Sequence, residues 1–228
     1  MKRATSQWLG AACLALTAGC AAPTVTLPPV SGARLLVVSD IDDTVRDTRV
    51  TVAPSSHVKN PLLLVDFLRP WSDVRGMAAL YRQWERQQGA VFAYVSGGPP
   101  IYRAALQKFL VTHDFPSGPI LLNRRFPIGT PEHKQHCVAM LLAAHPRARV
   151  ILIGDSGEHD PAIFSGLLAQ HSERIAGIFI RRVTDDAEVT VSQLDRRVPG
   201  GKWIVFREPS EITAARFDAV LKPRARRW

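Results

Sequence analysis

Four polar clusters follow apolar runs in this sequence, and their residue types suit reactions at a phosphate ester. A phosphomonoester hydrolyses extremely slowly in water, so a site that opens it needs a nucleophile, a proton donor and positive charge. Carboxylates, a lysine and backbone N–H groups can supply all three. The clusters are Asp40-Ile41-Asp42-Asp43-Thr44 after residues 35–38, Ser96-Gly97-Gly98 after 90–95, Lys134 within 130–145, and 154–160, with Asp155 and Asp160, after 150–153.

The first cluster holds two carboxylates two residues apart, Asp40 and Asp42. Asp40 is predicted to attack phosphorus and form an aspartyl-phosphate. In an extended chain Asp42 projects to the same side as Asp40. It is therefore predicted to protonate the leaving oxygen and then to activate the water that breaks the intermediate.

A carboxylate that attacks a phosphate dianion needs positive charge beside it, and the surrounding carboxylates predict Mg²⁺ as the cofactor. The expected ligands are Asp40, Asp155 and a backbone oxygen of Asp42. Asp160, five residues after Asp155, is expected to complete the metal shell through water. The sequence thus assigns one metal ion to the ends of two strands.

The oxygens of the phosphate need donors of their own. Lys134 and Ser96 are predicted to bind them. The backbone N–H groups of Gly97 and Gly98 are predicted to add to this binding.

Two other readings of the acidic and serine-containing clusters fail on residue type. A calcium-binding EF-hand needs a glycine at the sixth loop position, and the sixth residue from Asp40 is Val45. A lipase with Ser156 as nucleophile needs a histidine late in the chain, and none follows His171. Phosphate chemistry remains the interpretation that uses all four clusters.

The elements that position these residues alternate between strand and helix, which predicts a parallel sheet covered by helices on both faces. This is an α/β fold, a Rossmann-like three-layer sandwich, whose sites lie at the carboxyl ends of the strands. Continuous apolar runs indicate buried strands. Strands are predicted at 35–38, 90–95, 120–122, 150–153, 175–180 and 203–206. Helices are predicted from a cap at Ser72 or Asp73 to Gln88, and at 99–112, 130–145, 161–170 and 211–221.

With their order and strand context, the four clusters resemble the motifs of the haloacid dehalogenase superfamily. Within it, longer strings resemble the catalytic domain of the actin-patch-associated phosphatidate phosphatase family and its bacterial relatives. The resemblance covers about residues 34–183. The strings are SDIDDTV, FLRP, AYVSGGPPIY, HK, ILIGDSGEHDPAIF and RIAGIFIRRV.

This resemblance implies magnesium-dependent removal of phosphate from phosphatidate by an aspartate nucleophile. By this resemblance Asp40 is the nucleophile and Asp42 the acid/base. Ser96 and Lys134 bind the phosphate, and Asp155 and Asp160 bind the metal. The chain departs from these relatives at one place, where Gly98-Pro99-Pro100 stands instead of Ser-Pro-Trp. The superfamily inserts its cap between the first two motifs, and residues 45–71 leave room only for a small flap.

The N-terminus resembles a bacterial lipoprotein signal. Lys2 and Arg3 precede an apolar stretch that is too short to span a bilayer, and Cys20 follows it as the predicted lipidated residue. An ordinary secretory signal that contains a cysteine is the alternative. The predicted organisation is a signal peptide at 1–19, lipidated cysteine and tether at 20–33, the phosphatase domain at 34–221 and a basic tail at 222–228.

Localisation and partners follow from this N-terminus and from the charge. A lipid anchor at Cys20 predicts the bacterial cell envelope, and Ala21 resembles outer-membrane sorting that would face the protein to the periplasm. The formal net charge of +9 favours phosphate-bearing partners. No nucleic-acid recognition motif is present, so no specific nucleic acid is expected as a partner.

Three functions are therefore predicted in order. The first is a membrane-tethered phosphatase acting on a phospholipid monoester such as phosphatidate. The second is a broad-specificity periplasmic acid phosphatase for nucleotides or sugar phosphates. The third is a lipoprotein that binds phosphorylated surfaces without catalysis, which the filled reactive positions argue against.

Overall fold

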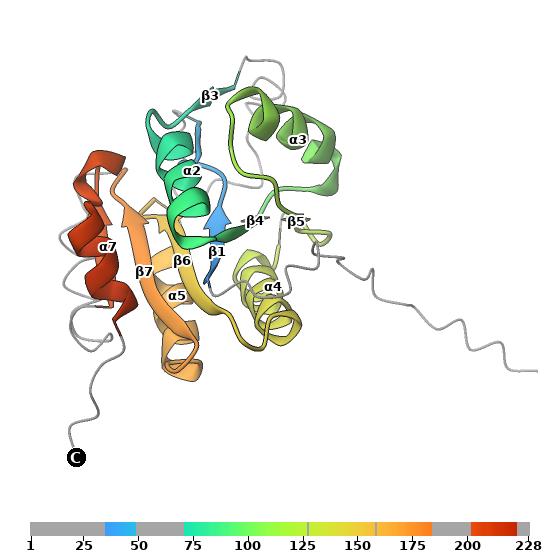
Figure 1. The fold of residues 1–228 in the computed structure, drawn as a ribbon. Coiled ribbons are helices and arrows are strands. Elements are labelled where there is room, and N and C mark those ends of the chain that lie inside the picture. Colours follow the sequence, from blue (N-terminus) through green and yellow to red (C-terminus); the bar gives the residue numbers. More distant parts are fainter. Residues whose placement is uncertain (1–34, 49–70, 127, 158, 184–201, 223–228) are drawn as a thin grey trace, which may run out of the picture.

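A six-stranded parallel sheet, in the order β5-β4-β1-β6-β7-β8, forms the centre of the fold (Figure 1). This computed structural model describes residues 35–48, 71–126, 128–157, 159–183 and 202–222. The strands are β1 (Leu35–Asp40), β4 (Val91–Ser96), β5 (Ile120–Leu122), β6 (Arg149–Asp155), β7 (Ile175–Arg181) and β8 (Trp203–Phe206). The predicted α/β class with a central parallel sheet is confirmed.

Helices cover both faces of the sheet, and alternation along β1 explains how. All six residues of β1 are buried, with Leu35 and Val37 in one apolar cluster and Leu36 and Val38 in the other. The first cluster takes in α2 (Met77–Gln88), α3 (Arg103–Thr112) and α7 (Ala214–Leu221). The second takes in α4 (Thr130–Ala144) and α5 (Asp160–Gln170).

The predicted cap at Ser72 or Asp73 is wrong. These residues form β3 (Ser72–Asp73), which pairs antiparallel with β2 (Arg46–Asp47). Helix α2 begins only at Met77, after Gly76 turns the chain with φ of 89°. Serine and aspartate are favourable helix-cap residues, but here their backbone pairs with that of β2 in a two-stranded antiparallel sheet.

Two other helix starts also differ from the prediction. A 3-10 turn, Pro100–Tyr102, precedes α3, and another, Pro209–Glu211, precedes α7. Helix α7 begins after Thr213, whose hydroxyl accepts a hydrogen bond from the Arg216 N–H at 3.3 Å. The helical regions were therefore correctly predicted, and their first turns were not.

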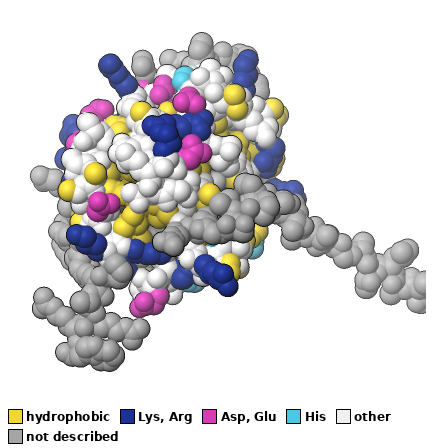
Figure 2. All heavy atoms as spheres, viewed as in Figure 1, with side chains coloured by type: hydrophobic (Ala, Val, Ile, Leu, Met, Phe, Trp, Pro, Cys, Tyr) yellow, Lys and Arg dark blue, Asp and Glu magenta, His cyan; other side chains and the backbone are white. Residues whose placement is uncertain are grey.

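Several predicted segments lie outside the described residues: the signal and tether with Cys20, most of the 45–71 flap, and the tail from 223. Within the ranges described, no helix has the length and apolar character needed to cross a membrane. On the face shown in Figure 2, basic side chains are interspersed with acidic ones. The positive charge on this face is thus dispersed.

Candidate active site

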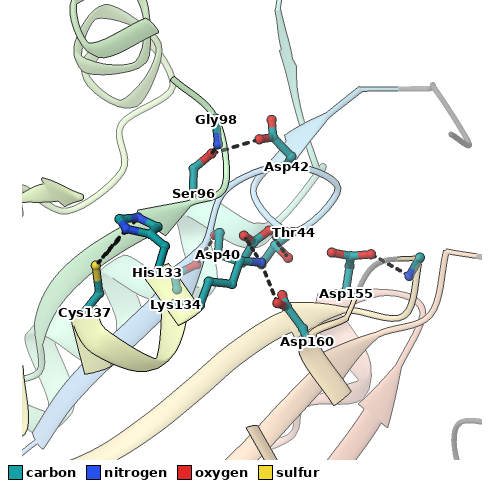
Figure 3. Close-up of polar contacts among 12 residues, drawn as sticks. Asp40, Asp42, Thr44, Ser96, Gly98, His133, Lys134, Cys137, Asp155 and Asp160 are labelled. Atoms are coloured by element: carbon teal, nitrogen blue, oxygen red, sulfur yellow. Dashed lines mark hydrogen bonds and ion pairs between the residues drawn. The ribbon is translucent and has the colours of Figure 1, made fainter. Parts of the chain in front are cut away.

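Four ionisable side chains meet at the carboxyl ends of β1 and β6, and we call them the buried centre: Asp40, Lys134, Asp155 and Asp160 (Figure 3). The ammonium of Lys134 lies 2.7 Å from Oδ1 of Asp40 and 2.5 Å from Oδ1 of Asp160. One carboxylate oxygen from each of the three aspartates lies within 4.8 Å of the others. Residues 115 positions apart in the sequence, Asp40 and Asp155, are therefore neighbours because β1 and β6 are adjacent strands.

The buried centre carries more negative than positive charge. At most 3% of the surface of each of its four residues is exposed to solvent. Three carboxylates against one ammonium leave two negative charges without compensation among these four side chains. Burying unbalanced charge is costly, so this site fits a divalent cation.

The donor chemistry fits a hard divalent cation such as magnesium. All three aspartates offer carboxylate oxygens, the ligand type that Mg²⁺ prefers. Oδ2 of Asp160 is buried and receives no hydrogen bond from the described residues. The carboxylate of Asp160 packs directly on Gly154, where any Cβ would overlap it. Glycine at position 154 is therefore what allows Asp160 to approach the end of β6.

Asp155 is fixed by the loop that follows it. The N–H of Gly157 donates to Oδ1 of Asp155 at 2.6 Å. The N–H of Ser156 donates to the carbonyl of Arg181 at 2.9 Å, which ties this loop to the end of β7. The loop therefore holds Asp155 over the carboxyl end of the sheet.

Beyond Asp40 the chain turns, which corrects the expectation of an extended segment. The N–H groups of Val45 and Arg46 both donate to the carbonyl of Ile41, at 3.0 and 2.9 Å. Asp43 stands at φ of 54°, in the left-handed region. The turn sends the Asp40 and Asp42 side chains to different partners.

Asp42 belongs to a second group, the outer cluster, formed with Arg46 and Ser96. Nε and Nη2 of Arg46 lie 2.8 and 2.6 Å from Oδ1 of Asp42. The hydroxyl of Ser96 donates to the other oxygen, Oδ2, at 3.1 Å. The Asp42 side chain is 29% exposed, against 3% for Asp40. The predicted acid/base thus has access to solvent that the predicted nucleophile lacks.

The loop after β4 fits tightly against the start of α4. A Cβ placed on Gly97 would lie 2.7 Å from Cγ2 of Thr130, so the approach needs glycine. The N–H of Gly98 is directed to the Ser96 hydroxyl at 3.0 Å, rather than outward as predicted for phosphate binding. The buried Asn123 supports this loop, because its N–H donates to the Gly98 carbonyl at 2.9 Å.

Asp43 stabilises the turn rather than joining the buried centre. It accepts hydrogen bonds from the N–H and hydroxyl of Thr48, at 3.0 and 2.7 Å. The carbonyl of Asp43 accepts a hydrogen bond from Nη1 of Arg181 at 2.7 Å. Burial raises the pKa of the Asp43 carboxyl, and the Thr48 hydrogen bonds oppose that rise.

The face of α4 behind Lys134 is neutral and apolar. Nε2 of His133 lies 3.4 Å from the Leu121 carbonyl oxygen and 3.6 Å from the Cys137 sulfur. Burial lowers the pKa of His133 and raises the pKa of the Cys137 thiol to about 12. Cys137 is therefore a buried, unreactive thiol.

The sequence predicted most of the residues of the site but not the residues that hold them in place. The structure brings Lys134, Asp155 and Asp160 together with Asp40, and it brings Ser96 together with Asp42. Arg46 and Asn123 were not predicted as site residues. No sequence pattern marked either residue.

Fold and site together define a Rossmann-like α/β domain with a carboxylate–lysine centre at the carboxyl ends of its strands. A model of the catalytic domain of phosphatidate phosphatase APP1 matches residues 35–182. Since this match spans well over half of the chain, the protein belongs to that family. The resemblance seen in the sequence is thereby confirmed.

Individual relatives agree with this assignment. The chain is 30% identical over 152 residues to phosphatidate phosphatase APP1 of Saccharomyces cerevisiae, covering 64% of this chain and 25% of the yeast protein. It is 31% identical over 157 residues to an uncharacterized protein of Schizosaccharomyces pombe, covering 66% and 25%. The chain therefore spans about a quarter of the length of the curated relatives it matches.

A solved structure with a similar arrangement is that of a β-phosphoglucomutase-like protein of Thermotoga maritima. The two share 15% sequence identity with a TM-score of 0.45, over 78% of this chain and 95% of the other.

Proposed function

We propose that this protein is a magnesium-dependent phosphatase that works through an aspartyl-phosphate at Asp40 and acts on a phospholipid monoester such as phosphatidate. The observation that carries the proposal is the buried centre, where the carboxylate oxygens of three aspartates lie close together around one position and the ammonium of Lys134 contacts two of these aspartates. Burying several charged side chains together does not by itself stabilise a folded protein. A site that binds a metal ion and a phosphate needs charged side chains of this kind.

The first half of the reaction uses both clusters. A carboxylate oxygen of Asp40 forms a bond to phosphorus as the bond from phosphorus to the ester oxygen breaks. Asp42, protonated at the start, gives its proton to the departing ester oxygen. Lys134 holds Asp40 in place through Oδ1 and stabilises negative charge on the phosphoryl group. When bound, Mg²⁺ supplies further positive charge and aligns the phosphoryl oxygens.

The second half returns the enzyme to its starting state. Asp42, now a carboxylate, takes a proton from water, and the resulting oxygen attacks phosphorus. The bond from phosphorus to Asp40 breaks, which releases inorganic phosphate and leaves Asp42 protonated. The exposure of Asp42 suits this step, because water reaches it while Asp40 remains buried.

The lipid substrate is supported by the relatives rather than by the site. The yeast relative carries the name phosphatidate phosphatase, and the matching family model describes the catalytic domain of that protein. The predicted lipid anchor at Cys20 would keep the domain near a membrane, where such substrates lie.

The test compares substrates on the full chain purified in detergent. Phosphate release would be measured from short-chain phosphatidate and from nucleoside monophosphates, each with Mg²⁺ and with EDTA. We expect magnesium-dependent release with phosphatidate preferred, and none from the Asp40→Asn variant. Equal or faster turnover of nucleotides would replace the lipid substrate with the broad-specificity alternative. Undiminished release by Asp40→Asn would refute the nucleophile.

The anchor forms a separate part of the proposal. We expect the chain to be lipidated at Cys20 and held in the bacterial cell envelope, at the outer membrane facing the periplasm. Radiolabelled palmitate fed to cells should label the wild-type protein and not Cys20→Ser, with Cys137→Ser as the matched control that keeps the label. Equal labelling of Cys20→Ser would overturn the anchor.

A further inference from the structure

Arg46 is built into the site by residues that take no part in the chemistry. Its guanidinium carbon lies 4.3 Å from the centre of the Trp71 ring, an arrangement that attracts a cation to an aromatic face. Only 5% of Arg46 is exposed. A buried arginine of this kind, stacked and paired at once, has little rotational freedom left.

Trp71 is in turn held by α3 and by the residues that cap its two ends. Its ring makes edge-on contacts with Tyr102 and Phe109, at centroid distances of 6.1 and 6.2 Å. The ring of His113 lies 3.2 Å from the Trp71 carbonyl. Arg46 therefore rests on a surface fixed by a helix that sequence separates from it by more than fifty residues.

The guanidinium of Arg46 also contacts Asp42, and both described contacts are with the same carboxylate oxygen. Nε and Nη2 both approach Oδ1, while Oδ2 receives the Ser96 hydroxyl. A guanidinium donates and never accepts. When Asp42 carries a proton, that proton is therefore excluded from Oδ1 and resides on Oδ2, on the side of Ser96.

We propose that Arg46, backed by Trp71, is a positioning residue that selects Oδ2 of Asp42 as the oxygen that delivers the proton to the leaving group. The inference rests on the proposed function, because it needs Asp42 to act as the general acid. The proton passes from Oδ2 to the ester oxygen as the bond to phosphorus breaks, and Arg46 loses and gains nothing. Without Arg46 the carboxyl rotates, and both oxygens compete for the proton.

The dependence of rate on the leaving group tests this directly. The alcohol of an alkyl ester such as short-chain phosphatidate needs a proton to leave, whereas the p-nitrophenol of p-nitrophenyl phosphate leaves as a stable anion. We measure kcat/KM, which covers the steps up to departure of the leaving group, on the full chain with Mg²⁺. For Arg46→Gln we expect a loss of about 100-fold with the alkyl ester and about tenfold or less with the aryl ester.

Three variants separate positioning from structure. Arg46→Lys keeps the charge without the planar fork, and should recover part of the alkyl-ester rate. Trp71→Leu removes the ring that supports Arg46, and should change the ratio of the two rates in the same direction, while Trp71→Phe should preserve it. Arg181→Gln is the matched control, because Arg181 binds the neighbouring Asp43 carbonyl and not the Asp42 carboxylate. It should lower both rates by the same factor.

Each outcome has one meaning. A change of about tenfold or more in the ratio for Arg46→Gln and Trp71→Leu, absent in Arg181→Gln, supports the proposal. An unchanged ratio overturns it, however large the common loss. Should Arg46→Gln fail to fold, the ratio in Trp71→Leu relative to Trp71→Phe decides. A wild-type protein that hydrolyses neither short-chain phosphatidate nor p-nitrophenyl phosphate refutes the proposed function itself, which is a different result from an unchanged ratio.

Discussion

The buried centre and the outer cluster use the same residue type in opposite environments. Asp40 is 3% exposed and meets an ammonium, while Asp42, two residues later, is 29% exposed and meets a guanidinium and a hydroxyl. The first environment leaves charge for a cation to balance and excludes water. The second is already balanced and open to solvent. A nucleophile benefits from the first, and a group that exchanges protons with water benefits from the second.

The strongest way to break this comparison is to neutralise the buried carboxylate. Asp40→Asn should lower turnover by about 10⁴-fold or more, because amide nitrogen and oxygen are poor nucleophiles. Circular dichroism should show an unchanged fold. Asp43→Asn is the control one turn away, since Asn retains an oxygen to accept from Thr48. If the two variants lose activity equally, the distinction between the buried position and its neighbour is lost.

The exposed carboxylate should behave differently when it is neutralised. Asp42→Asn should lower turnover of alkyl phosphates by about 10²- to 10⁴-fold, as expected for loss of a general acid and base. Because nucleophilic attack at Asp40 is untouched, an aryl phosphate should still phosphorylate the protein. Acid quenching after mixing with radiolabelled aryl phosphate should then recover phosphoenzyme in greater amount than in wild type. Its complete absence would show that phosphorylation needs Asp42 even when the leaving group requires no proton, which contradicts a role limited to acid and base.

Magnesium should stabilise one cluster and leave the other unaffected. At about 100 times its dissociation constant a ligand adds about 2.7 kcal/mol to the free energy of unfolding. For a domain of this size that corresponds to a rise in Tm of about 5–10 °C. Differential scanning calorimetry with Mg²⁺ and with EDTA would measure it. Asp155→Asn should abolish the rise, while Arg46→Gln should keep it. A rise that survives in Asp155→Asn would contradict the assignment of the metal to the buried centre.

The smallest expected effect concerns the loop that links the two clusters. Gly97→Ala should lower the free energy of unfolding by about 1–3 kcal/mol, since the new methyl overlaps Cγ2 of Thr130 at 2.7 Å. Adding Thr130→Ala removes the overlapping atoms and should restore most of the loss. A double-mutant cycle by urea unfolding measures the coupling. Independent effects of the two substitutions would show that the close approach is not what Gly97 provides.

Sequence reasoning succeeded where one local pattern carries both fold and chemistry. An apolar run such as 35–38 predicts a buried strand, and a polar residue directly after it must lie at the edge of the sheet. Asp40, Ser96 and Asp155 were found in this way. The same logic failed at Ser72, whose residue type suits a helix cap as well as a short ribbon. Nothing local distinguishes these two uses, because the deciding partner is the distant β2.

Arg46 shows the limit for the site. As one of many basic residues in the sequence it carried no distinguishing mark, and its importance comes from Trp71 on one side and Asp42 on the other. Asn123 is similar, since its N–H supports the Gly98 carbonyl across two loops.

By itself the sequence determined the α/β sheet and the set of groups that can act on a phosphate, because strand periodicity and residue chemistry are local properties. Tertiary structure alone decided how those groups are divided. Because of the turn at 41–46, Asp40 contacts Lys134 whereas Asp42 contacts Ser96. Contact with Phe109 of α3 fixes Trp71, which stacks on Arg46. Burial, charge balance and the choice of one carboxylate oxygen over the other depend on neighbours far along the chain, which no local pattern records.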